Sequence, residues 1–172
     1  DAAAAAGGHI VAIPRDNLPV LAQQGSAEPV WNPEEEWTPV TKLRTHAGAR
    51  TTVLALGAPA YVAIEAAEAV AKQTPADVFA INGFPLPAGF FASLASTYKR
   101  VITIEDGLIG TVDSGLRGFA GFAASHLLGS GARLQSFGIT DPGVAPSDHF
   151  VEIWKHYGMT AEALAAAIER EG

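Results

Sequence analysis

From Thr51 onward, short apolar runs alternate with stretches of helical pattern, and this alternation indicates the fold class. Runs of strand length, rich in β-branched and apolar residues, occupy 51–56, 77–81, 100–104 and 132–137. Helices are predicted between and after them over 60–73, 88–98, 111–128, 148–157 and 160–170, with Thr111 placed to cap the third helix. Parallel strands need a crossover connection, and that crossover is usually a helix. We therefore predict an α/β fold, a three-layer α/β/α sandwich with helices on both faces of a parallel sheet.

The first fifty residues have a different character. An apolar run at 9–13 has strand length, but the segment after it is interrupted by Pro14, Pro19, Pro29, Pro33 and Pro39. Proline fixes φ and removes a backbone donor, so this stretch cannot form one long helix or a central strand. Trp31 and Trp37 flank an acidic run at 34–36. Two large aromatic residues in an irregular segment indicate an arm that lies along a folded surface.

The chain starts with Asp1, five alanines and two glycines, without an initiator methionine or a basic leader region. This start does not have the form of a signal peptide. We expect it to be the cut end of a longer polypeptide.

Composition excludes several classes of protein. At 172 residues the chain is long enough for one domain with an attached arm. It has no cysteine, which excludes disulfides, thiolate metal sites and thiol nucleophiles, and fits a reducing compartment such as the cytoplasm. With 18 acidic and 11 basic residues the net charge is −7, so we expect neither nucleic acid nor anionic lipid as a partner. No apolar run reaches about 18 residues, so no segment is expected to span a membrane.

Several familiar types of site lack their motifs. The first regular strand is followed by one glycine, Gly57, where a dinucleotide fingerprint needs three, and no G-x-S-x-G follows a strand. His149 and His156 are seven residues apart, which is too far along a helix for a shared metal ion without a third ligand. The sequence around His149 favours a turn followed by a helix N-cap, and His126 lies near a helix end, where it would interact with the helix dipole.

Glu105 and Asp106 follow the third regular strand and are candidates for a site, because α/β sheets place their sites at the carboxyl ends of strands. The pair could serve acid–base chemistry or form half of a metal site. Alternatively, these carboxylates could cap the next helix and neutralise its dipole, or meet an arginine of a neighbouring subunit. The residues favour the second interpretation, because no histidine lies nearby in the sequence.

Segments along nearly the whole chain resemble, in order, segments of transketolases. Residues 13–21 (IPRDNLPVL) are similar to the S-R-Q-N-L-P segment that ends the pyrimidine-binding domain of that family. Residues 51–70 (TTVLALGAPAYVAIEAAEAV) are similar to its T-G-S-E-V…A-A strand–helix unit, and residues 101–106 (VITIED) to its V-x-V-E strand. The FG…AP…FG-x-T run that closes these enzymes resembles Phe137-Gly138, Ala145-Pro146 and residues 157–160 (YGMT).

The resemblance implies a domain organisation. Residues 51–172 would form the C-terminal domain of a transketolase-like, thiamine-diphosphate-dependent enzyme, a small sandwich with a mostly parallel, about five-stranded sheet. Residues 1–50 would contain the end of the preceding pyrimidine-binding domain and the linker arm. In that family the domain supports the dimer, and catalysis lies elsewhere. The implied partners are the remaining thiamine-diphosphate-binding domains of the same enzyme and a second copy in a homodimer.

This chain alone is not expected to hold the cofactor of that family. Transketolases bind thiamine diphosphate through Mg²⁺ at a Gly-Asp-Gly…Asn-Asn motif, and this sequence has neither Gly-Asp-Gly nor Asn-Asn. The glutamate that activates the cofactor ring belongs to another domain. The resemblance therefore implies thiamine diphosphate and Mg²⁺ in the complete enzyme, and neither cofactor nor turnover in this chain by itself.

The resemblance also implies roles for single residues. Arg15 takes the place of the arginine that binds the sugar phosphate, and a guanidinium suits a phosphate through paired, charge-assisted bonds. Asp16 replaces the glutamine of that family and puts a negative charge beside this site. An ion pair between Arg15 and a carboxylate of the acidic arm is an equally good interpretation. Glu105 matches a glutamate of the family, and we expect an interface or interdomain role for Glu105 and Asp106.

Three functional hypotheses result. The first is the C-terminal domain or fragment of a transketolase-like transferase, which moves a two-carbon ketol unit between sugar phosphates and uses this domain for packing and dimer contacts. The second is a partner-binding C-terminal domain of a 2-oxoacid dehydrogenase or another thiamine enzyme, slightly favoured by the loop after Ile104 and by residues 81–87 (INGFPLP). The third is a stand-alone binding module of α/β fold without a link to thiamine.

Overall fold

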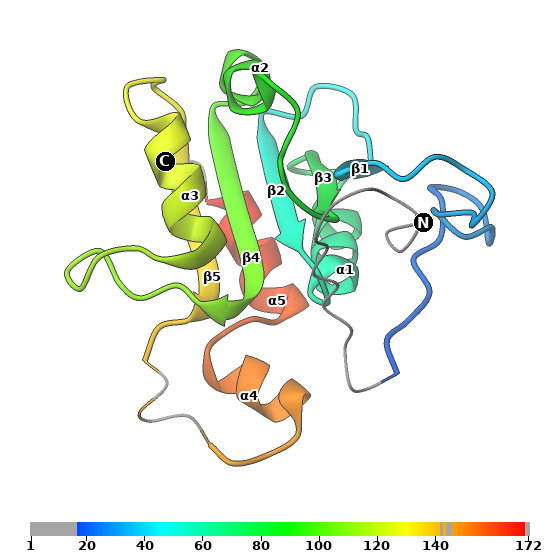
Figure 1. Cartoon of the computed structure of the whole chain (residues 1–172). Coiled ribbons are helices and arrows are strands. Elements are labelled where there is room, and N and C mark those ends of the chain that lie inside the picture. Colours follow the sequence, from blue (N-terminus) through cyan, green and yellow to red (C-terminus); the bar gives the residue numbers. More distant parts are fainter. Residues whose placement is uncertain (1–16, 142, 144–145, 171–172) are drawn as a thin grey trace, which may run out of the picture.

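A five-stranded sheet forms the centre of the molecule in the computed structural model, which describes residues 17–141, 143 and 146–170 (Figure 1). The run at 9–13, Arg15 and Asp16 lie outside the described residues. The elements in chain order are β1 (Val40–Arg44), β2 (Thr51–Leu56), α1 (Ala60–Val70), β3 (Ala76–Ile81), α2 (Phe90–Thr97), β4 (Arg100–Leu108), α3 (Gly118–Leu127), β5 (Arg133–Ile139), α4 (Phe150–His156) and α5 (Ala161–Glu169).

The strand order is β1-β3-β2-β4-β5. Strands β2, β3, β4 and β5 run parallel, and β1 pairs with β3 in the antiparallel direction at one edge. The predicted mostly parallel, five-stranded sheet is therefore confirmed. Because the parallel strands share one direction, their amino ends lie together at one end of the sheet, uppermost in Figure 1, and their carboxyl ends lie at the other.

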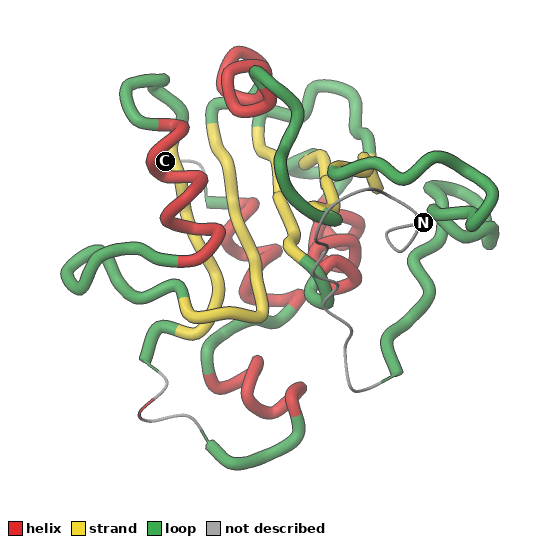
Figure 2. The backbone as a smooth tube through the Cα atoms, viewed as in Figure 1, coloured by secondary structure: helices red, strands yellow, loops and turns green. Residues whose placement is uncertain are grey.

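Helices cover both faces of the sheet, as predicted for a three-layer sandwich. Successive side chains of a strand point to opposite faces, so neighbours in β2 belong to different cores. Val53 packs with α1 and α5, whereas Leu54 packs with α2 and α3. Figure 2 shows these two helical layers on either side of the strands. None of the helices in the described part of the chain is long and apolar enough to cross a membrane.

Two elements differ from the sequence prediction. Helix α3 begins at Gly118, so the prediction of a helix from Thr111 is wrong. Positive φ angles at Gly110 (66°) and Gly115 (89°) hold the intervening chain in a loop, because helical residues need negative φ. Thr111 and Ser114 hydrogen-bond to each other within that loop. The second difference is β1, an edge strand that forms within the proline-rich segment ahead of Thr51.

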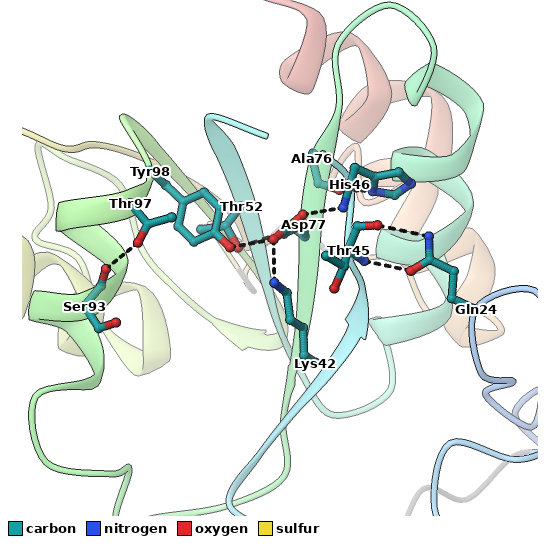
Figure 3. A network of polar contacts seen from close by, with 10 residues as sticks. All are labelled: Gln24, Lys42, Thr45, His46, Thr52, Ala76, Asp77, Ser93, Thr97 and Tyr98. Atoms are coloured by element: carbon teal, nitrogen blue, oxygen red, sulfur yellow. Dashed lines mark hydrogen bonds and ion pairs between the residues drawn. The ribbon is translucent and has the colours of Figure 1, made fainter. Parts of the chain in front are cut away.

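A buried carboxylate, Asp77 at the start of β3, holds β1 and α2 against the sheet (Figure 3). Asp77 is 4% exposed. Its Oδ2 lies 2.7 Å from Lys42 Nζ in β1 and accepts a 2.6 Å hydrogen bond from the hydroxyl of Tyr98, the residue that ends α2. Its Oδ1 accepts a 2.8 Å bond from the backbone N–H of His46, just after β1. One side chain thus joins three segments that are far apart in the sequence.

These contacts shift the pKa values of both partners. Burial alone would raise the pKa of Asp77, but the hydrogen bonds and charge of Lys42, Tyr98 and His46 outweigh burial and bring that pKa below its ordinary value. Burial and the neighbouring Asp77 carboxylate raise the pKa of the Tyr98 hydroxyl. The contribution of the Asp77 carboxylate to the free energy of unfolding is therefore lost as pH falls below about 4. The contribution of the Tyr98 hydroxyl is lost as pH rises above about 10.

We predict that Tyr98→Phe lowers the free energy of unfolding at pH 7 by about 1.5–3 kcal/mol, because the charged Asp77 loses a buried hydrogen bond. The variant should also lose less stability than the wild type above pH 10, since the titrating hydroxyl is gone. Urea unfolding followed by tryptophan fluorescence from pH 3 to 11 measures both effects. Tyr157→Phe is the matched control, because the Tyr157 hydroxyl donates to an exposed backbone oxygen, that of Asp141. Equal losses in the two variants would contradict the role of Asp77.

Candidate functional site

The carboxyl end of β4 holds Glu105, whose side chain caps α3. Glu105 is 5% exposed, and its two carboxylate oxygens accept hydrogen bonds from the backbone N–H groups of Phe119 (3.1 Å) and Ala120 (2.8 Å). The first N–H groups of a helix have no partner within the helix, and a negative charge there also opposes the positive end of the helix dipole. The structure therefore supports the capping interpretation of Glu105. Thr111, expected from the sequence to cap this helix, does not do so.

Two glycines leave room for this buried carboxylate. Gly118 has a positive φ of 58°, and a Cβ there would lie 2.7 Å from Glu105 Oε2. A Cβ on Gly107 would lie 3.0 Å from the same oxygen. Burial raises the pKa of the Glu105 carboxyl, although the two backbone hydrogen bonds act in the opposite direction. The energy of keeping this group ionised thus offsets part of the benefit of the cap.

Asp106 lies next to Glu105 but faces solvent. Its Oδ1 accepts a 2.9 Å hydrogen bond from Trp154 Nε1, and the Trp154 side chain is buried among residues of the α1–α5 face. The bond therefore attaches α4 to the end of β4. The two carboxylates have separate structural partners, one on each side of the sheet, and the predicted interface role of the pair stays a prediction.

An aromatic cluster lies between α2, α3 and the loop after β3, and sequence reasoning missed it. Phe84 packs edge-on against Phe119 and Phe122, with ring centroids 6.2 Å and 5.5 Å apart, and Phe122 contacts Phe91 of α2. Phe84 is 50% exposed and Phe122 38% exposed. We name Phe84, Phe91, Phe119 and Phe122 the Phe84 cluster. The signals of it in the sequence were the spacing of Phe119 and Phe122 on one helix and the segment 81–87, which contains Phe84.

The remaining sequence candidates have local structural contacts. His149 is the N-cap of α4, as the sequence favours, and its Nδ1 accepts from the N–H of Val151. His126 lies in the last turn of α3, where its ring stacks on Phe91 at 5.0 Å. Within residues 17–141, 143 and 146–170, no three histidine or acidic side chains are grouped so that they could hold a metal ion. Arg15, the predicted phosphate ligand, lies outside the described residues.

Solved transketolase structures share this fold. The chain matches a protein described as "Split gene transketolase, inactive beta4 tetramer", where beta4 denotes the tetramer and not a strand. The identity is 23% and the TM-score 0.67, over 81% of this chain and 45% of that one. It matches the transketolase of Campylobacter jejuni subsp. jejuni with 16% identity and a TM-score of 0.54 over 82% of this chain and 20% of that one. It matches the transketolase of Leishmania mexicana with 13% identity and a TM-score of 0.51 over 75% of this chain and 17% of that one.

These likenesses show that the fold is that of a transketolase C-terminal-type domain. The chain spans less than half the length of each of these proteins. No family model matches its sequence, and no curated protein does. Sequence identities below 25% support a likeness of fold alone, so the expected resemblance is confirmed at the level of the fold.

We predict that Glu105→Ala lowers the free energy of unfolding by about 2–4 kcal/mol, because two N–H groups of α3 lose a charged acceptor. Glu105→Gln, which keeps one carbonyl acceptor and removes the buried charge, should lose less. Glu152→Ala is the control, because Glu152 pairs with Lys155 on the surface of α4. Its loss should stay below about 1 kcal/mol. Chemical denaturation of the three variants would contradict the capping role if Glu105→Ala behaved like Glu152→Ala.

Proposed function

We propose that this chain serves as the C-terminal domain of a transketolase-like enzyme that moves a two-carbon ketol unit between sugar phosphates. The observation that carries the proposal is the match of four fifths of this chain to less than half of a split-gene transketolase chain. A second polypeptide or further domains would supply the thiamine diphosphate site with its Mg²⁺, for which this sequence has neither the Gly-Asp-Gly nor the Asn-Asn segment. The absence of cysteine fits a cytoplasmic enzyme.

In this proposal the chain contributes docking surface within the assembled enzyme, which we expect to be a homodimer. The Phe84 cluster supports that role, because half-exposed aromatic side chains on a packed base are typical anchors of protein interfaces. Phe84 and Phe122 present such side chains, and Phe91 and Phe119 form the buried base below them. The occupant we propose is a thiamine-diphosphate-binding domain of the same enzyme. Glu105 and Asp106 would act by positioning α3 and α4 around this end of the sheet.

The docking role predicts that Phe84→Ser weakens association with the thiamine-diphosphate-binding polypeptide of the same source by about tenfold or more, as expected for an aromatic anchor. Leu128→Ser is the matched control, because Leu128 is an apolar residue that is 87% exposed at the other end of α3. Calorimetric titration of the two purified polypeptides measures the affinities. Ketol transfer should require both polypeptides together.

Two results would contradict this proposal. The first is equal affinity of the Phe84 and Leu128 variants, which would remove the Phe84 cluster from the interface. The second is micromolar binding of thiamine diphosphate and Mg²⁺ by this chain alone, because the cofactor site would then lie within it.

For Arg15 we predict that Arg15→Ala in the assembled enzyme raises KM for phosphorylated substrates by about tenfold or more, since a charged hydrogen-bond donor to phosphate is lost. KM for unphosphorylated analogues should change little. Steady-state kinetics with matched pairs of sugars and sugar phosphates tests this role. Equal increases for both substrate types would indicate that Arg15 acts through structure and does not bind phosphate.

A further inference from the structure

The amino ends of three neighbouring parallel strands bring basic residues together. Thr51 of β2, Arg100 of β4 and Arg133 of β5 are register partners across the sheet. Arg50 and Lys99 come directly before β2 and β4, and the N–H of Lys99 donates to the carbonyl oxygen of Arg50 at 2.8 Å. The parallel arrangement thus places cations side by side that are about fifty and thirty residues apart in the sequence.

These residues line a pocket of about 850 Å³ at this end of the sheet. Arg170, just after α5, adds a fifth cation. Apolar surface comes from Leu134 and Ile168, and no aspartate or glutamate is among the described lining residues. The volume lies within the range of small-molecule sites. We name Arg50, Lys99, Arg100, Arg133 and Arg170, with the space between them, the basic pocket.

The charge of the basic pocket is not balanced by carboxylates within the described part of the chain. It holds five of the 11 basic residues of a protein whose net charge is −7. Three basic residues elsewhere form ion pairs: Lys42 with Asp77, Arg44 with Glu68, and Lys155 with Glu152. Among residues 17–141, 143 and 146–170, none of the five pocket cations has a carboxylate within 4 Å.

Arg100 is fixed by the fold, whereas the side chains of Arg50, Lys99 and Arg133 donate no hydrogen bond to the residues that the structure describes. The Arg100 guanidinium donates to the carbonyl oxygens of Ala167 and Arg170 and to Gln135 Oε1, so it anchors the end of α5. Burial lowers the pKa of Arg100, and the positive charges of Arg170 and Arg133 lower it further. This repulsion means that a bound anion would relieve unfavourable contacts between cations.

We propose that the basic pocket is a binding site for a small anion with two or more phosphate groups, held by Arg50, Lys99 and Arg133. Two features favour phosphate. Guanidinium groups offer paired donors in the geometry of phosphate oxygens. Several cations around one pocket also suit a ligand with several charges. A pocket of this volume fits a small molecule, whereas the acidic overall charge disfavours a nucleic acid. Leu134 and Ile168 provide contact for an organic part of the ligand.

Calorimetric titration of the full chain with inorganic pyrophosphate at low and high salt tests this proposal. We expect saturable binding that weakens as salt increases, because the contacts are charged. The double variant Lys99→Gln/Arg133→Gln should bind pyrophosphate at least about tenfold more weakly. Lys155→Gln is the charge-matched control and should bind like the wild type, since Lys155 lies on α4, away from the pocket. Thermal unfolding of each variant verifies that it is folded.

Four results would overturn the proposal. The first is that the wild type does not bind pyrophosphate, and the second is that Lys155→Gln loses as much affinity as the double variant. The third is that the wild type binds citrate as tightly as pyrophosphate. The fourth is that the wild type is an oligomer without affinity for pyrophosphate and that the double variant is a monomer. The third result would mean that the pocket responds to negative charge in general and not to phosphate. The fourth would mean that it is an interface between protein chains. None of these measurements depends on ketol transfer.

Discussion

A parallel sheet buried on both faces is the constraint on which the other features of this molecule depend. Parallel strands cannot be joined by tight turns, so each connection crosses a face and leaves a helix there. Helices α1 and α5 close one face, and α2 and α3 close the other. With the faces filled, the two ends of the sheet and its edges are left for polar chemistry. The direction of the strands then separates two of these features, because the basic pocket lies at the amino ends of the strands and Glu105, which caps α3, lies at the carboxyl end of β4.

The regular elements could be predicted because their patterns are local. The runs from Thr51 onward have the apolar spacing of strands and helices, and the observed elements match them closely. The start of α3 could not be predicted from neighbouring residues, because its N–H groups are satisfied by Glu105, which precedes the helix by more than ten residues. Strand β1 was missed for the same kind of reason. Its position depends on Asp77, about thirty residues further along the chain.

The candidate sites depend even more on contacts between residues that are far apart in the sequence. The capping role of Glu105 was among the alternatives that the sequence allowed, because a carboxylate between a strand and a helix has few common uses. The Phe84 cluster and the basic pocket combine residues from separate strands, helices and loops. In the sequence, Arg50 and Lys99 are ordinary polar residues that each precede a strand, and Arg133 is one at the start of a strand. Only their register across the sheet makes them one group.

The arm and the loop that carries Phe84 are attached to each other. The Asn82 side chain donates to Thr38 O at 3.0 Å and to Thr41 Oγ1 at 2.8 Å. Next to it, Trp37 lies so close to Gly83 that a Cβ there would be 2.9 Å from the indole ring. A displacement of the arm before β1 would therefore move this loop and the aromatic ring of Phe84. The segment that enters the domain is thus mechanically coupled to a surface more than forty residues later in the chain.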